Sequence, residues 1–202
     1  MNRRIGIWAS VGATITVALF ALSMVFSLVS ISYATSFLFS WCYLLMTCAF
    51  YVKAPKERRV AAVSGIAFAC VYVTLIGLVY FTQLTTVLYQ TESADVVLAL
   101  TYAPGRWFFA LDLLGYAFLS LSALFVGLTL VPKNKVDKWL KVLLLLHGLY
   151  APACILMPIL NVFRVDASGA SDVSGVIALM GWCIHFIPIA VLSALHMKNL
   201  DN

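Results

Sequence analysis

The stretch that decides the fold is WFFALDLLGYAFLSLSALFVGLTLV, residues 107–131, in which Asp112 is the one charged side chain. The hydrocarbon core of a bilayer is about 30 Å thick and an α-helix rises about 1.5 Å per residue, so roughly 20 apolar residues are enough to cross it. We therefore predict a transmembrane helix here. Its carboxylate is a functional hypothesis, because a charge at the bilayer centre costs on the order of 3 kcal/mol.

The rest of the chain has the same apolar character. Of its 202 residues, 63% are apolar and 10% are charged, and the mean hydropathy is +1.02, whereas about a quarter of the residues in soluble domains are charged. Five further segments are long and apolar enough to span a bilayer: 7–29, 37–52, 60–82, 140–163 and 176–195. We predict an all-α polytopic membrane protein, a single domain over residues 1–202 with six transmembrane helices surrounded by the lipid bilayer.

The basic residues lie on alternate sides of these spans. All of the thirteen except Arg106 and Arg164 precede the first span or follow the second, fourth and sixth spans. By the positive-inside rule, this pattern predicts that the N-terminus and the C-terminus are both cytoplasmic. The small size and the retained first span favour a bacterial cytoplasmic membrane. Nucleic acid is not an expected partner, because there is no basic surface beyond these short loops.

The sequences between the spans, and the prolines within one of them, also predict local structure. The polar stretch 30–36 predicts the turn between the first two spans. The long connection 83–105 contains an apolar run that Ser93 is able to cap, and we expect a brief interfacial helix there. That helix either covers the outer face of the bundle or belongs to an ordered loop. Pro152 and Pro158 fall within the fifth span and predict a bent helix, because proline removes a backbone hydrogen bond.

Two stripes of small residues predict close helix packing. Ala9 and Ala13 are one helical turn apart in the first span, and Ala61, Gly65 and Ala69 follow one another at intervals of four in the third. Small side chains let neighbouring helices approach closely. We expect the third helix to be central in the bundle. Either stripe is also a possible contact surface for a partner subunit.

Four polar residues share one level of the predicted bundle. Counting from the ends of the spans places Asp112 roughly 6 to 8 Å below the outer boundary, with Asn161 slightly below that boundary and Arg106 and Arg164 at it. One interpretation is that Asp112 pairs with an arginine or another polar group and fixes helix packing. The others are that Asp112 binds a ligand or ion, or that it takes part in proton chemistry.

Enzymatic chemistry has weaker support. By the same count His185 lies near mid-membrane and His147 toward the cytoplasmic side. A histidine in such a place usually forms a hydrogen bond with a neighbouring helix. These residues and Asp112 are spread over about 15 Å of depth by the helix rise, which does not suit a zinc site. No nucleophile motif or phosphate-binding loop is present. We expect no metal and no cofactor, and an enzyme is the least favoured class.

The second half of the chain resembles a known group of sequences. The segments FFALDLLGYAFLSLSALFVGLTL (108–130), WLKVLLLLHGLYAP (139–152) and GWCIHFIPIAVLSAL (181–195) are similar to a widespread group of uncharacterised six-span bacterial membrane proteins. In that group an Asp-x-x-Gly-Tyr element, here Asp112 to Tyr116, opens the fourth helix. This resemblance implies no function. The six-span size and the topology also look like the substrate-capturing subunits of bacterial vitamin transporters, a likeness of architecture only.

Three functions remain open at this point. The first is a small-molecule-binding or transport protein whose outward-facing polar pocket is formed by Asp112, Arg106, Asn161, Arg164, Tyr116 and His185. The second is a non-catalytic accessory subunit of a membrane complex, in which the polar residues only fix packing. The third is an intramembrane enzyme. A cavity lined by Asp112 favours the first, and a closed bundle with Asp112 paired to an arginine favours the second.

Overall fold

The structure is a computed structural model that describes residues 1–163 and 173–199. These residues form helices and, within the described ranges, no strand. The elements are α1 (Asn2–Val25), α2 (Val29–Lys53), the 3-10 turn η1 (Lys56–Arg58), α3 (Arg59–Thr82), the π-helical turn η2 (Gln83–Val87), α4 (Ala94–Leu100), α5 (Trp107–Thr129), α6 (Lys135–His147), α7 (Tyr150–Ile159) and α8 (Val173–Lys198). Six stretches among them are long and apolar enough to cross a membrane. The all-α, six-span prediction is confirmed.

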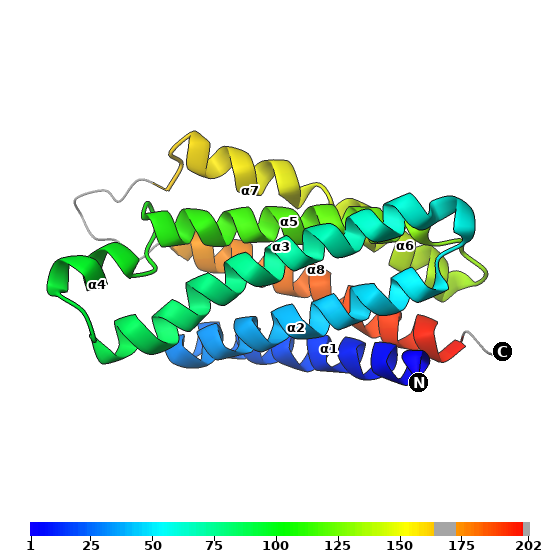
Figure 1. The fold of residues 1–202 in the computed structure, drawn as a ribbon, viewed down its shortest axis with the longest axis horizontal. Helices are drawn as coiled ribbons and strands as arrows, with labels where there is room; N and C mark the ends of the chain where they lie inside the picture. Colours follow the sequence, from blue (N-terminus) through cyan, green and yellow to red (C-terminus); the bar gives the residue numbers. More distant parts are fainter. Residues whose placement is uncertain (164–172, 200–202) are drawn as a thin grey trace.

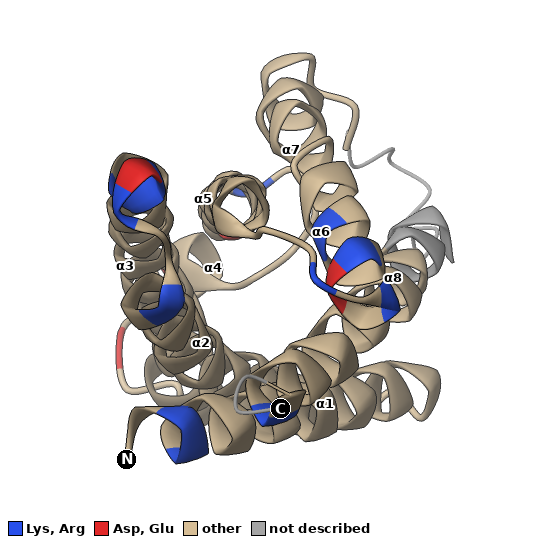
Figure 2. Ribbon diagram, turned by 90° about the vertical axis from the view of Figure 1, so that its right-hand side faces the viewer, with Lys and Arg blue, Asp and Glu red and all other residues tan. Residues whose placement is uncertain are grey.

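Both termini lie at the same end of the bundle. Figure 1 shows them beside each other, together with the α2–α3 and α5–α6 connections. The Arg3 Nε atom donates a hydrogen bond to the Met197 carbonyl oxygen at 3.1 Å, which ties the start of α1 to the end of α8. Figure 2 shows blue Lys and Arg segments gathered at this end, which we call the basic end. The helix α4 lies at the opposite end (Figure 1).

The helix α5 has more neighbours than α3. α3 packs against α2 and α5, whereas α5 packs against α3, α6 and α7 and also contacts α2. The prediction that the third span is central is therefore wrong. Its small residues mark a close approach to one neighbour: a Cβ added at Gly65 would lie 3.2 Å from Val126 Cγ2 on α5. Close approach at a small residue needs only one partner helix and does not require a central position.

Both stripes of small residues are used for packing within the chain. Ala9 and Ala13 are 5% and 0% exposed, where α1 packs against the rest of the bundle. Gly65 and Ala69 are buried on α3, and Ala61 is partly buried. Neighbouring helices of the same chain cover most of both stripes, which leaves little of either for a partner subunit. The partner surface expected at these residues is thus replaced by internal packing.

The first turn lies earlier than the serines of 30–36 predict. The chain turns at residues 26–28, and the polar stretch forms the first turns of α2. The hydroxyls of Ser32 and Thr35 donate to backbone carbonyls three and four residues earlier, at 2.6 and 2.8 Å. Serine and threonine hydroxyls can thus be satisfied by their own helix, which lets a polar stretch continue into the membrane. The second span is therefore a full 25 residues long.

The fifth span is interrupted instead of only bent, and the break precedes its prolines. α6 ends at the turn of Gly148 and Leu149. Pro152 lies in the first turn of α7, where a missing N–H costs no helical hydrogen bond, and Pro158 lies near the end of α7. A Cβ added at Gly148 would lie 2.9 Å from Leu124 Cβ on α5. The close approach of α5 thus explains why a glycine is needed at the break.

The long connection between α3 and α5 contains the expected short helix. α4 begins directly after Ser93, which occupies the N-cap position, although its side chain makes no capping hydrogen bond. Before it, the turn η2 extends α3 beyond Thr82. Such π-helical turns are frequent at functional sites because they reorient a side chain relative to the rest of the helix. Here the turn begins at the buried Gln83.

Candidate binding site around Asp112

The helix α5 places Asp112 inside the bundle near the end that carries α4. Its side chain is 1% exposed. The carboxylate oxygen Oδ2 accepts a hydrogen bond from the Tyr102 hydroxyl at 3.0 Å, and the Tyr80 hydroxyl lies next to the same carboxylate. The other oxygen, Oδ1, is fully buried and has no hydrogen-bond partner among the described residues. The carboxylate therefore retains an unused acceptor.

Residues 101–105, which we call the strap, connect α4 to α5 and cover the carboxylate. The Gln83 side chain holds the start of the strap: its Oε1 accepts from the Tyr102 backbone N at 2.8 Å, and its Nε2 donates at 2.8 Å to the carbonyl oxygen of Leu100, the last residue of α4. Burial, with the charge of Asp112 beside it, raises the pKa of the Tyr102 hydroxyl well above its ordinary value. Tyr102 therefore remains a hydrogen-bond donor at neutral pH.

Three aromatic rings from three different elements meet beside the strap. Tyr33 of α2, Tyr80 of α3 and Tyr102 of the strap form an aromatic triad. The ring centroids are 5.4 Å apart for the first pair, 5.8 Å for Tyr33 and Tyr102, and 6.2 Å for Tyr80 and Tyr102. The faces of aromatic rings carry negative charge density and attract cations. The site therefore combines a carboxylate with aromatic faces.

No arginine or lysine of the described residues pairs with Asp112. Arg106, which we expected to reach down to it, donates instead to the backbone carbonyl of Leu98 in α4. The short helix brings a carbonyl within reach of this rim arginine, which the sequence did not indicate. Arg164, the other expected rim arginine, lies outside the described residues. The carboxylate is thus without a positive counter-charge in the described part of the chain.

Two of the expected pocket residues do share a cavity, but Asp112 is not in its wall. Arg106 and Asn161 line a cavity of about 250 Å³ together with the ends of α5 and α7. Asn161 has a φ of 53°, in the left-handed region that asparagine tolerates at the end of a helix. Its backbone N donates to the Pro158 carbonyl oxygen at 3.0 Å. The outer polar level expected from the sequence is therefore divided into two separate sites.

The other two expected residues lie deeper in the bundle. Tyr116 is one helical turn from Asp112 on α5, and its ring lies 5.2 Å from that of Trp182. The Nε2 atom of His185 lies 3.1 Å from the Leu143 carbonyl oxygen of α6. Its partner is therefore a neighbouring helix, as we expected for a histidine within a span. His185 does not take part in the site around Asp112.

Further unpartnered polar groups lie behind Tyr116. The Tyr72 hydroxyl, the Trp182 Nε1 atom and both ring nitrogens of His147 are buried without a hydrogen-bond partner among the described residues. The rings of Trp182 and His147 are 6.4 Å apart, and those of Tyr72 and Tyr116 are 5.9 Å apart. Buried polar groups are rarely left unpaired, because each costs free energy. The interior next to the site can therefore form hydrogen bonds with a ligand or water.

Several of these residues were not expected from the sequence. Tyr33, Tyr80 and Tyr102 lie on three separate elements, and only the fold brings them together. Of the residues around the site, Gln83 could have been singled out from the sequence, since it is an amide directly after an apolar span. Within the described residues, no group of three or more His, Cys, Asp or Glu side chains is arranged to hold a metal ion.

Comparison with protein-family models, curated proteins and solved structures gave no match for this chain. The resemblance of the Asp-x-x-Gly-Tyr element to six-span bacterial proteins therefore stays a prediction. The structure places the two outer residues of that element, Asp112 and Tyr116, on one face of α5. Any assignment of function rests on this geometry.

Proposed function

We propose that the protein binds a small organic cation between Asp112 and the aromatic triad, as a binding or transport protein of the membrane. The observation that carries the proposal is the buried Asp112 carboxylate. It has one unused oxygen and no counter-charge among the described residues. An ionised carboxylate in this state costs several kcal/mol, which a bound cation would recover.

The surroundings of the carboxylate favour an organic cation over a metal ion. Calcium and magnesium need six or more oxygen ligands, including water or several carboxylates. Here the neighbours of Asp112 are the rings of Tyr33, Tyr80 and Tyr102. A desolvated cation on an aromatic face gains about 2 kcal/mol, in addition to its attraction to a carboxylate. An ammonium group bearing small alkyl substituents offers the complementary chemistry, a positive charge for the carboxylate and C–H surface for the rings.

The strap gives the site a means of opening. It is held by the hydrogen bond from Tyr102 to Asp112 and by the two hydrogen bonds of Gln83. A ligand that engages the carboxylate competes with the first of these bonds. The second anchor then keeps the strap near the site and allows it to close again. Closed loops of this kind exclude water from a bound ligand.

The direction of access follows from the distribution of charge. The basic end carries both termini, and the positive-inside rule assigns it to the cytoplasm. The strap lies at the opposite end and would face outward. The proposed ligand would then be captured from the outside of the membrane, which in a bacterium is the outer side of the cytoplasmic membrane.

The alternative of a non-catalytic accessory subunit is favoured by one observation. The hydrogen bond from Tyr102 to Asp112 also serves to fix the strap on α5, and a carboxylate with that task alone needs no ligand. The two functions differ in what the unused Oδ1 atom does. In the accessory function it binds nothing, whereas in the proposed function it contacts the cation.

Mass spectrometry of co-purified small molecules tests the proposal and does not require the ligand to be identified beforehand. The wild-type chain and Asp112→Asn are purified side by side and their extracts compared for cationic species. Asp95→Asn serves as a control, because Asp95 is an exposed carboxylate of the neighbouring α4. We expect a cation enriched with wild type and Asp95→Asn and at least tenfold depleted with Asp112→Asn. Equal amounts in all three would contradict the proposal.

A further inference from the structure

A second polar cavity lies at the basic end, far from the strap. Its volume is about 350 Å³, and it is enclosed by the end of α2, the α5–α6 connection and the end of α8. The polar side chains in its wall are Lys53, Thr129, Lys133, Asn134, Asp137, His196 and Asn199. Asp137 and His196 are only 4% and 8% exposed, so the floor of this cavity is a buried pair.

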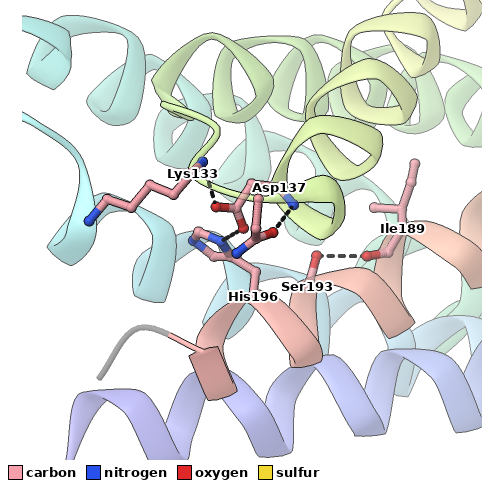
Figure 3. A network of polar contacts seen from close by, with 6 residues as sticks. Lys133, Asp137, Ile189, Ser193 and His196 are labelled. Atoms are coloured by element: carbon pink, nitrogen blue, oxygen red, sulfur yellow. Dashed lines mark hydrogen bonds and ion pairs between the residues drawn. The ribbon is translucent and has the colours of Figure 1, made fainter. Parts of the chain in front are cut away.

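Figure 3 shows how the chain fixes this pair. The Nδ1 atom of His196 lies 2.7 Å from Asp137 Oδ1, and Asp137 Oδ2 accepts from the Lys133 backbone N at 3.0 Å. The Asn134 side chain accepts from the Asp137 backbone N at 2.9 Å and caps α6. The Phe50 ring stacks on the imidazole at 5.6 Å. The carboxylate is thus occupied by protein donors, and the imidazole is held in one orientation.

Three nitrogen groups in this cavity have no hydrogen-bond partner within the described residues. The hydrogen bond between His196 Nδ1 and Asp137 leaves the second ring nitrogen, Nε2, without a partner among the described residues. The same hydrogen bond fixes the orientation of the ring, so that Nε2 is presented to the cavity. The ammonium groups of Lys53 and Lys133 also have no partner in the described part of the chain. Figure 3 shows the Lys133 side chain extending away from Asp137.

The neighbouring basic residues form hydrogen bonds with backbone carbonyls of the same chain. Arg58 donates to the Leu128 and Leu130 carbonyl oxygens at 2.9 and 2.8 Å, and Lys141 donates to the Leu130 carbonyl at 3.0 Å. These bonds hold the end of α5, which forms one wall of the cavity. They leave Lys53 and Lys133 as the two ammonium groups available to a ligand.

We propose that this cavity binds a phosphate group, through Lys53, Lys133 and His196. Two ammonium groups supply charge-assisted hydrogen bonds of the kind that phosphate oxygens accept, and the oriented imidazole presents Nε2 for a further hydrogen bond. The cavity lies where the spans end, at the level of lipid headgroups, and basic pockets at this level recognise anionic headgroups. The phosphate therefore comes either from a lipid headgroup or from a phosphate-bearing solute, and the two share the same chemistry.

The test uses the full chain, purified in detergent and examined by native mass spectrometry and thermal unfolding. Phosphatidylglycerol, phosphatidylcholine and inorganic phosphate are the three probes. The test variant is Lys53→Gln with Lys133→Gln. The control is Lys135→Gln with Lys138→Gln, which removes the same charge from the same end but from residues outside the cavity. All four lysines are exposed, so both pairs are expected to fold.

We expect wild type and the control pair to retain phosphatidylglycerol, and the test pair to retain at least tenfold less. Stabilisation of wild type by inorganic phosphate as well would identify a solute source. Stabilisation by phosphatidylglycerol alone would identify a headgroup. Equal retention by wild type and the test pair would overturn the proposal, and so would an equal loss in both lysine pairs, since that would indicate surface charge alone.

Discussion

The chain buries two carboxylates, one near each end of the bundle, and the two differ in their hydrogen-bond partners. Asp137 at the basic end is 4% exposed, and both of its oxygens are engaged, by His196 and by the Lys133 backbone. Asp112 at the strap end is 1% exposed; Tyr102 donates to Oδ2 with the Tyr80 hydroxyl beside the carboxylate, while Oδ1 has no hydrogen-bond partner among the described residues. Both side chains are buried, so the difference is one of hydrogen-bond partners and not of exposed fraction.

This difference gives one carboxylate a structural role and the other a role in binding. In a low-dielectric interior a fully satisfied polar network rigidifies its surroundings, and an unsatisfied group is a source of free energy for anything that pairs with it. Asp137 therefore belongs to the architecture that holds His196 in place. Asp112 retains one carboxylate oxygen, Oδ1, that accepts no hydrogen bond from the described residues. Substitutions at and around the two carboxylates test whether they differ in this way.

The largest expected effect is at the satisfied carboxylate. Asp137→Ala leaves the Lys133 N–H and the His196 ring without their acceptor, and we expect it to lower the free energy of unfolding by about 3 kcal/mol. Thermal or denaturant unfolding in detergent measures this loss. Asp95→Ala, on the exposed surface of α4, should change stability by less than about 0.5 kcal/mol. A stable Asp137→Ala protein would remove the basis of the comparison.

The next effect concerns the anchor of the strap. Gln83→Leu keeps the volume of the side chain but removes two hydrogen bonds, one to Tyr102 in the strap and one to Leu100 directly before it. With about 1 kcal/mol for each bond, opening should become easier by about 2 kcal/mol, or roughly thirtyfold. Hydrogen exchange of the amides between residues 100 and 106 measures it. Thr85→Val is the matched control, because the Thr85 hydroxyl bonds only to its own helix, at Phe81.

A smaller effect is expected at the tyrosine that covers the carboxylate. Tyr102→Phe retains the ring contacts of the aromatic triad and removes one hydrogen bond to Asp112. The strap should open about fivefold more readily, which corresponds to about 1 kcal/mol. The same exchange measurement reports it. An effect as large as that of Gln83→Leu would mean that Asp112, and not Gln83, is the principal anchor.

The smallest effect on stability is expected at the unsatisfied carboxylate itself. In Asp112→Asn the amide oxygen still accepts from Tyr102, while an uncompensated charge is removed. Stability should therefore stay within about 0.5 kcal/mol of wild type or rise. Thermal unfolding checks this beside Asp137→Asn, which is expected to destabilise. A loss at Asp112→Asn equal to that at Asp137→Asn would indicate a purely structural role.

Hydropathy predicted the architecture because a bilayer leaves few choices. Each of the six spans has to satisfy its own backbone hydrogen bonds, so length and apolar character were enough to find them. The boundaries were less certain where hydroxyls bond to their own helix, as at Ser32 and Thr35. The prolines predicted a bend in the fifth span, whereas the chain breaks earlier, at Gly148, because α5 approaches closely there.

The site was predicted in part. Asp112 stood out as the lone acid of an apolar span, and Tyr116 accompanies it on α5. Depth alone grouped Asp112 with Arg106 and Asn161, but depth says nothing about which face of a helix a residue occupies. The aromatic triad comes from three elements distant in sequence, and the pair of Asp137 and His196 is 59 residues apart. Only the packing of the helices brings such residues together.

The most direct measurement is calorimetric titration of the purified protein with tetramethylammonium chloride, at constant ionic strength maintained with sodium chloride. Our account predicts saturable binding to wild type and to Asp95→Asn, and binding at least tenfold weaker to a folded Asp112→Asn protein. Tyr102→Phe should retain binding, since the cation uses the ring face. Equal heats for wild type and Asp112→Asn, with this cation and with choline, would contradict the account.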